Sequence, residues 1–285
     1  NRLRTSMCSS LNADDYLLAY ESEDSFDKRS CYVDDGYFCM LDDGEGLSPL
    51  YKDKLDVAVG RIPVSNVVDA ENVVSKIINY VANANGGAWQ NTIMFMGDDG
   101  DGNMHMIDAN YVADKVISNH PGYVVKKVMW DAYNRVSTAS GFTYPEVTSI
   151  IKKQQQQGAL IMNYAGHGSE VQLSHEKVVG IKDFAAFNNT NLPLWVTAAC
   201  DIMPFDAGEE TIGEAAMLNK KGGTVAFYGT TRTVYANYNT LLNESFMKHV
   251  LTYDDDNLPI TLGEAQRRAK NDMTMRRYCE NALQY

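Results

Sequence analysis

The stretch ALIMNYAGHGS, residues 159–169, decides the fold of this chain, and LWVTAACD, residues 194–201, completes it. Each stretch opens with an apolar run typical of a buried parallel strand. The first then reaches His167, and the second reaches Cys200. Because open α/β sheets collect their ligands outside the carboxyl ends of the strands, the pattern predicts a histidine and a cysteine side by side at such an edge.

A cysteine beside a histidine base is the arrangement needed for a thiol nucleophile. A single cysteine at a strand end is more often a small buried hydrophobe, so the prediction depends on the pair. His167 and Cys200 are 33 residues apart, which is one crossover between strands. Gly168 has no side chain, so its N–H can approach a carbonyl closely. With the N–H of Cys200 it would form a two-donor oxyanion hole.

Strands and helices alternate over most of the chain, and residues 1–54 form acidic, Gly- and Ser-rich loops with short strands. We predict strands at 55–59, 92–96, 123–130, 159–164, 194–199 and 224–228. We predict helices at 66–84, 104–119, 144–157, 211–220, 238–251 and 261–278. This alternation favours an α/β fold whose parallel sheet is covered by helices on both faces.

Composition excludes several classes of function. The 285 residues are 45% apolar and carry a net charge of -12, which suits a large globular core and argues against nucleic-acid binding. No apolar run of about 18 residues is present, so we expect no membrane span. The five cysteines are too few, and odd in number, for a disulfide framework. Pairing of Cys31 with Cys39, or of either with Cys8, stays open.

The motifs NYAGHGSE, LPLWVTAACD and GGTVAFYGTTRTVYA resemble the gingipain family of cysteine peptidases, clan CD family C25. The resemblance extends through YVDDGYFCMLDDGEG, LDVAVGRIPV and TLGEAQRRAKN, so it covers essentially the whole chain. It implies a caspase-like three-layer αβα sandwich with mostly parallel sheets in two side-by-side subdomains. We expect the first subdomain at 1–86, incomplete at its N-terminus, and the second, catalytic subdomain at 87–285, truncated at its C-terminus.

The resemblance also assigns roles to single residues. His167 matches the catalytic histidine, Cys200 the nucleophile and Gly168 the oxyanion glycine. An acidic residue of the family orients the histidine, and Asp108 fits that position best, with Asp131 as the second candidate. The alternative for Asp108 is a solvated acid in the first turn of a helix, where it complements the helix dipole.

Further residues are expected around the cleft. Glu170, His175, Met203 and Tyr228 are candidate substrate-binding residues, and we expect His175 in the cleft wall rather than as the base. The other histidines, His105, His120 and His249, are expected at the surface.

No cofactor is required for the expected reaction, although gingipains carry structural calcium. Asp98 and Asp101 lie in an acidic loop that fails the EF-hand pattern. The loop is a candidate calcium site, with a plain turn as the alternative.

Within the family, the segments LSHE and TTRTVYANYNTLLN are most similar to the sortases of the type IX secretion system of Bacteroidota. That similarity implies an enzyme at the outer-membrane surface of a Gram-negative bacterium. It would remove the C-terminal secretion domain of cargo proteins and transfer the cargo to a surface amine, with type IX secretion components as partners. The alternatives are a secreted gingipain-like endopeptidase and a catalytically silent surface scaffold.

Overall fold

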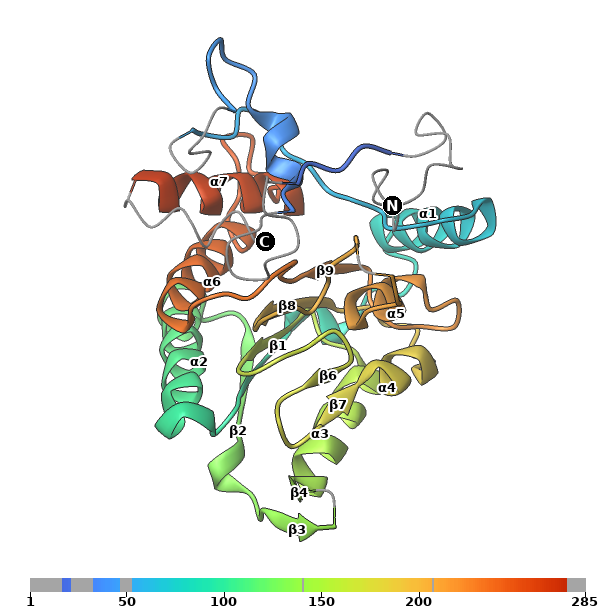
Figure 1. Ribbon diagram of the computed structural model, residues 1–285, viewed down its shortest axis with the longest axis vertical. Coiled ribbons are helices and arrows are strands. Elements are labelled where there is room, and N and C mark those ends of the chain that lie inside the picture. Colours follow the sequence, from blue (N-terminus) through green and yellow to red (C-terminus); the bar gives the residue numbers. More distant parts are fainter. Residues whose placement is uncertain (1–16, 22–32, 47–52, 140, 207, 276–285) are drawn as a thin grey trace.

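A five-stranded parallel sheet forms the centre of the protein (Figure 1). The computed structural model describes residues 17–21, 33–46, 53–139, 141–206 and 208–275. The strands lie in the order β2-β1-β5-β8-β9. Their bounds are β1 Thr92–Gly97, β2 Val124–Met129, β5 Ile161–Ala165, β8 Leu194–Ala198 and β9 Ala226–Tyr228. The inner strands β1, β5 and β8 are almost wholly buried, which explains their nearly continuous apolar sequence.

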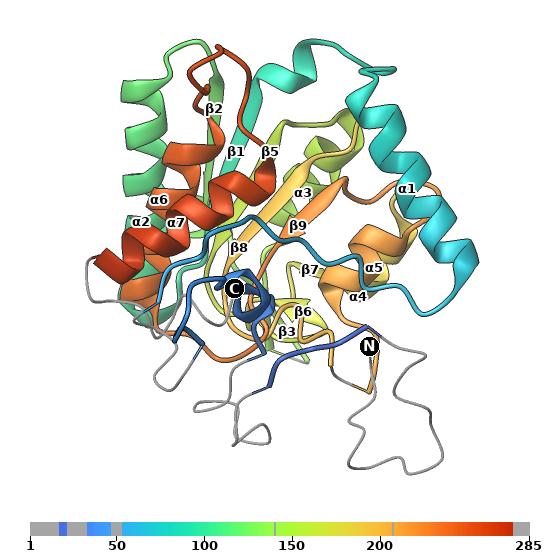
Figure 2. The ribbon, with the colours of Figure 1, turned by 90° about the horizontal axis from the view of Figure 1, so that it is seen from above.

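Helices cover both faces of the sheet (Figures 1 and 2). One face carries α2 Gly100–Asn119, α6 Ala236–Val250 and α7 Leu262–Met275, and the other carries α3 Pro145–Gln157, α4 Ile181–Ala186 and α5 Ile212–Leu218. Successive residues of β1 pack into different hydrophobic cores. Phe95 packs with the first group of helices, whereas Met94 and Met96 pack with the second. This alternation follows from the period-2 side-chain geometry of a strand. The predicted parallel sheet between two helical layers is confirmed.

The chain from residue 53 to residue 81 packs against helices α5 and α7 and contains no strand. The strand predicted at 55–59 was wrong, because this segment is irregular in the structure. Side chains of α7 replace the strand partners it would need. The Leu55 N–H donates to Asn271 Oδ1 at 2.8 Å, and the Leu55 carbonyl accepts from Asn271 and Arg267. The division at residue 86 stays a prediction.

Helix α1, Val67–Val81, begins where the sequence predicted it. The side chain of Asn66 accepts a hydrogen bond from the Asp69 N–H at 2.9 Å and caps the helix. Its Lys76 reaches α5 and donates to three carbonyl oxygens at the end of that helix, those of Met217, Asn219 and Gly222. Burial lowers the pKa of Lys76 to about 8.

The shortest elements, of two to six residues, were not predicted because they carry too little periodicity. They are the pairs β3 Val136–Thr138 with β4 Gly141–Thr143 and β6 Gln172–Leu173 with β7 Val179–Gly180, helix α4, and the 3₁₀ helices η2 Asp35–Cys39, η4 Ala88–Asn91 and η5 Trp130–Ala132. The remaining predicted elements are present with ends shifted by a few residues.

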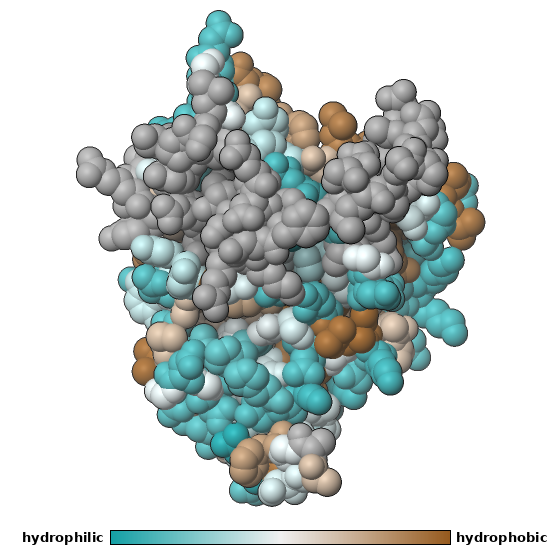
Figure 3. Space-filling model, viewed as in Figure 1, coloured by the Kyte–Doolittle hydropathy of each residue, from teal (hydrophilic) through white to brown (hydrophobic). Residues whose placement is uncertain are grey.

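Among the residues coloured in Figure 3, the face shown is mostly hydrophilic. Exposed apolar side chains gather on α1, where Val67, Ile78 and Val81 are all more than half exposed. Across the described residues, no helix has both the length and the apolar composition needed to cross a membrane.

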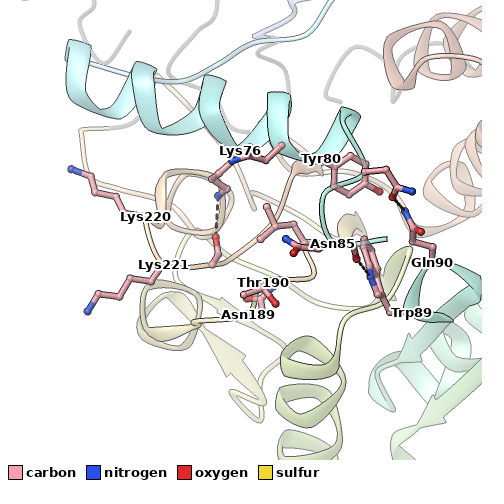
Figure 4. Close-up of a pocket in the computed structure, with 13 residues that line it drawn as sticks. Lys76, Tyr80, Asn85, Trp89, Gln90, Asn189, Thr190, Lys220 and Lys221 are labelled. Carbon is pink, nitrogen blue, oxygen red and sulfur yellow. Dashed lines mark hydrogen bonds between the residues drawn. The ribbon is translucent and has the colours of Figure 1, made fainter. Parts of the chain in front are cut away.

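A cavity of about 180 Å³ lies at the amino-terminal edge of the sheet (Figure 4). It is lined by residues that precede β1, β8 and β9, among them Trp89, Asn189 and Lys221. The side chains of Lys220 and Lys221 point away from it (Figure 4). His167 and Cys200 follow the carboxyl ends of their strands, so this cavity is at the opposite edge from them.

Candidate active site

The strand register places His167 and Cys200 at equivalent points of neighbouring strands. β5 and β8 pair in parallel, and Ala165 lies opposite Ala198. His167 and Cys200 each follow two residues later, at the carboxyl edge of the sheet. The Gly166 N–H still donates to the Ala198 carbonyl at 3.2 Å, so the two loops leave the sheet together. The predicted neighbourhood of these strands is confirmed, while the catalytic roles stay predictions.

The backbone of His167 is held by groups beneath it. Its N–H donates to Asp98 Oδ2 at 3.1 Å, and its carbonyl accepts from the Tyr164 hydroxyl at 2.8 Å. Asp98 is only 1% exposed, and its other oxygen accepts from the Gly100 N–H at 2.7 Å. A Cβ on Gly100 would come within 2.8 Å of the His167 ring. A glycine at position 100 therefore leaves room for the imidazole.

The His167 ring lies between two other imidazoles. The ring of His175 stacks on it at a centroid distance of 4.4 Å, and His105 meets it edge to face at 4.9 Å. Asp101 Oδ2 lies 3.4 Å from His167 Nε2. Asp101 has a left-handed backbone, with φ 52°. In this ring orientation, Nε2 is the nitrogen that faces the Asp101 carboxylate, and the role of His167 as a base stays a prediction.

The Cys200 thiol is partly buried and forms hydrogen bonds with the backbone of Val234. It donates to the Val234 carbonyl at 3.5 Å and accepts from the Val234 N–H at 3.4 Å. Burial raises the thiol pKa, the hydrogen bond from Val234 opposes the rise, and Asp201 adds to it.

Gly168 lies directly against the Cys200 turn. A Cβ at this position would come within 3.0 Å of the Cys200 carbonyl oxygen and 2.4 Å of Ile202 Cδ1. Only glycine fits here without a shift of the neighbouring loop. The close approach places the backbones of the two predicted oxyanion donors together, while their role stays a prediction.

A buried ion pair holds the loop that follows Cys200. Arg232 donates two hydrogen bonds to the Asp206 carboxylate at 2.9 and 2.7 Å, and both side chains are about 5% exposed or less. The Arg232 carbonyl accepts from the Asp201 N–H at 3.2 Å. The pair thus connects the turn that carries Cys200 to the segment that follows β9.

Asp108 lies on α2 and is not the carboxylate at the His167 ring, which is that of Asp101. Burial raises the Asp108 pKa, while a hydrogen bond from Thr240 and the nearby His105 lower it. Asp131 is exposed in η5. An orienting role for Asp108, or for Asp131, stays a prediction.

The predicted substrate-binding residues fall into two groups. Met203 and Tyr228 line a shared cavity of about 120 Å³, together with Asp35 and Arg61. His175 lies at the His167 ring instead.

Glu170 joins the histidine loop to α5, because its carbonyl accepts from the Ile212 N–H at 2.8 Å. A role in substrate binding stays a prediction for all four residues.

The two predicted calcium ligands, Asp98 and Asp101, lie in different clusters of side chains. Asp98, Asp99 and Glu176 offer carboxylate oxygens within 4.8 Å of one another, the ligand type that calcium takes. Asp101 instead faces the imidazoles of His105 and His167. Asp98, but not Asp101, fits an oxygen-only site, and calcium itself stays a prediction.

The prediction that His105 lies at the surface was wrong. The residue is buried, with 7% exposure, rather than at the surface. Burial lowers its pKa, the nearby His167 lowers it further, and surrounding acids raise it. The signal was in the sequence, because positions 105, 109, 112 and 116 form one helical stripe that faces the sheet. Of the cysteines, Cys39 is buried and free, and Cys8, Cys31 and Cys279 lie outside the described residues.

Comparison with known proteins identifies the family of this chain. The sequence profile of peptidase family C25 matches residues 7–285. The chain belongs to peptidase family C25. No curated protein matches the chain significantly.

Solved structures extend the comparison. The Arg-specific cysteine proteinase gingipain R (RGPB) superposes with a TM-score of 0.66 at 17% identity, covering 88% of this chain and 56% of that one. The complex of the Porphyromonas gingivalis RgpB pro- and mature domains gives 0.65 at 17% identity, with 88% and 57% covered. A chain described as a protease gives 0.66 at 16% identity, with 85% and 52% covered. This C25 chain therefore has a gingipain-like fold and spans little more than half the length of these structures.

Proposed function

We propose that this C25 chain carries the catalytic centre of a cysteine peptidase that uses Cys200 and His167. The observation that supports the proposal best is the register of β5 and β8, which puts both residues two positions beyond a paired alanine. The close approach of Gly168 to the Cys200 carbonyl adds to it. Thiol, base and two backbone donors then share one sheet edge.

In the proposed reaction, His167 takes the thiol proton and Cys200 sulfur attacks a peptide carbonyl carbon. The N–H groups of Gly168 and Cys200 hold the oxyanion. The C–N bond breaks as His167 returns the proton to the leaving amine, and a thioester remains. Water or an amine then attacks the thioester carbon, gives up its proton to His167 and restores the thiol. Because burial raises the pKa of Cys200, proton transfer to His167 is needed before the attack.

We further propose that the resolving nucleophile is an amine and that the protein is a sortase of the PorU type. The support is the resemblance of LSHE and TTRTVYANYNTLLN to the type IX secretion sortases. On this proposal the substrate is the C-terminal secretion domain of cargo proteins. The amine belongs to a lipopolysaccharide, and the site of action is the outer-membrane surface beside other secretion components.

The test separates the enzyme from a scaffold, and the sortase from a hydrolase. The full-length protein that carries this chain is incubated with a peptide library, with and without added glycine ethyl ester. Mass spectrometry then reads the new C-termini. Amine adducts support the sortase, and free acids alone support an endopeptidase. Cys200→Ala should abolish both products, and Cys39→Ala is the matched control. Absence of any product would favour the silent scaffold.

A further inference from the structure

Two histidines and one carboxylate meet beside the sheet edge. The potential ligand atoms of Asp101, His105 and His167 all lie within 4.8 Å of one another. The three residues come from α2 and from the loop after β5. None of the three needs a large movement to share an ion.

One of these ligand atoms lacks a hydrogen-bond partner among the described residues. His105 Nε2 is buried and makes no hydrogen bond with any residue that the structure describes, and the residue is 93% buried because its exposure is 7%. Burying an imidazole nitrogen without a partner is costly. The nitrogen lies 3.4 Å from Asp101 Oδ2, in the direction of the His167 ring. An ion between the three groups would satisfy it.

The spacing suits a small four-coordinate metal. A tetrahedral zinc ion with bonds of about 2.0–2.1 Å separates neighbouring ligand atoms by about 3.3 Å. Asp101 Oδ2 lies 3.4 Å from Nε2 of both His105 and His167. Two of the three ligand separations therefore already fit. Solvent reaches the site through Asp101, whose side chain is 54% exposed.

We infer that Asp101, His105 and His167 form a zinc-type transition-metal site, with the fourth position open to water. Two imidazole nitrogens and one carboxylate are ligands that zinc takes readily, whereas calcium and magnesium prefer oxygen. The site is thus distinct in chemistry from the oxygen cluster of Asp98, Asp99 and Glu176.

Metal binding at this site occupies Nε2 of His167 and fixes the ring. A neutral imidazole that binds a metal ion through Nε2 carries its proton on Nδ1. It therefore cannot accept the proton of Cys200, so zinc is a reversible inhibitor of the peptidase. This consequence rests on the proposed function, whereas metal binding itself does not.

The experiment measures binding directly in a background that lacks the reactive thiol. The protein with Cys200→Ser is titrated with Co²⁺, which is followed by its visible absorption, and with Zn²⁺ by calorimetry. We expect one equivalent to bind, and millimolar Ca²⁺ not to compete. Asp101→Asn and His105→Gln should each weaken binding at least about tenfold. His249→Gln is the control, because its ring pairs with Asp272 on the α6–α7 side.

Circular dichroism checks the fold of each variant. If His105→Gln does not fold, Asp101→Asn still decides, because that side chain is largely exposed. Binding that survives both changes, or that His249→Gln weakens equally, overturns the inference. Binding that requires Asp101 and His105 supports it even if the protein has no peptidase activity. With activity present, Zn²⁺ should inhibit, and a chelator should restore turnover.

Discussion

Gly168 lies so close to Cys200 that a Cβ at position 168 would come within 3.0 Å of the Cys200 carbonyl oxygen. The two loops thus share one packed surface at the sheet edge. The same Cβ would also meet Ile202 Cδ1 at 2.4 Å and Ala199 Cβ at 3.0 Å. The distance between the loop that carries His167 and the turn that carries Cys200 therefore depends on this glycine.

Gly168→Ala should lower both stability and turnover. Relief of the contacts with Ile202 and Ala199 requires the loops to separate, and such overpacking costs about 1–3 kcal/mol. The separation also moves the two predicted oxyanion donors. Urea denaturation and peptide cleavage measure the two effects. Gly122→Ala is the matched control, because a Cβ there meets nothing within 4 Å. Equal effects of the two substitutions would contradict this account.

Iodoacetamide should label Cys200 before Cys39. Cys200 is partly exposed, whereas Cys39 is 2% exposed and burial also raises its pKa. Because burial raises the Cys200 pKa, the thiolate fraction and the labelling rate should keep rising with pH beyond the ordinary thiol range of about 8.5.

His167→Ala should slow that labelling near neutral pH and leave it unchanged at high pH, where the thiol ionises without help. Peptide mapping by mass spectrometry gives the rates for each cysteine. A Cys200 that reacts no faster than Cys39 would favour the scaffold, and equal rates with and without His167 would remove that residue as the base.

Asp101→Asn should lower kcat more than Asp108→Asn. The Asp101 carboxylate lies 3.4 Å from His167 Nε2 and favours the tautomer whose Nδ1 accepts a proton. Burial raises the pKa of Asp108, which lies near Thr240 and His105 instead. The loss should stay below the roughly 10²–10⁴-fold contribution of a general base, and Cys200→Ala should abolish turnover.

Steady-state kinetics of the two asparagine variants decide between the carboxylates. A larger loss in Asp108→Asn would restore Asp108 as the orienting acid predicted from the sequence. Unchanged kinetics in Asp108→Asn would leave that residue as a helix acid, and Asp131→Asn would be the next variant to measure.

Arg232→Met should destabilise the protein by about 3–5 kcal/mol, because it removes the cation that donates two hydrogen bonds to the buried Asp206 carboxylate. The two side chains are 5% and 4% exposed. The double variant Arg232→Met with Asp206→Leu should lose less, since the buried carboxylate is removed together with the cation. Urea denaturation of the three proteins measures the difference. A double variant no more stable than Arg232→Met would show that other contacts of these residues dominate.

Much of the fold was predictable from local patterns. The apolar runs of β1, β5 and β8 are buried on both faces, so composition alone marks them as inner parallel strands. The stripe of α2 and the cap at Asn66 located helices in the same way. These signals are local because burial and capping act on neighbouring residues. The strand predicted at 55–59 failed because its partners are α7 side chains more than 200 residues away.

By itself, the sequence determined that His167 and Cys200 follow strand ends and that glycine lies next to the histidine. Only the tertiary structure decided which strands are neighbours, which groups surround each side chain, and which carboxylate reaches the ring. The register of Ala165 with Ala198 brings the two loops together. The thiol pairs with Val234, and His105 is buried beside His167. These contacts join residues distant along the chain, so no local periodicity encodes them and packing of the whole sheet fixes them.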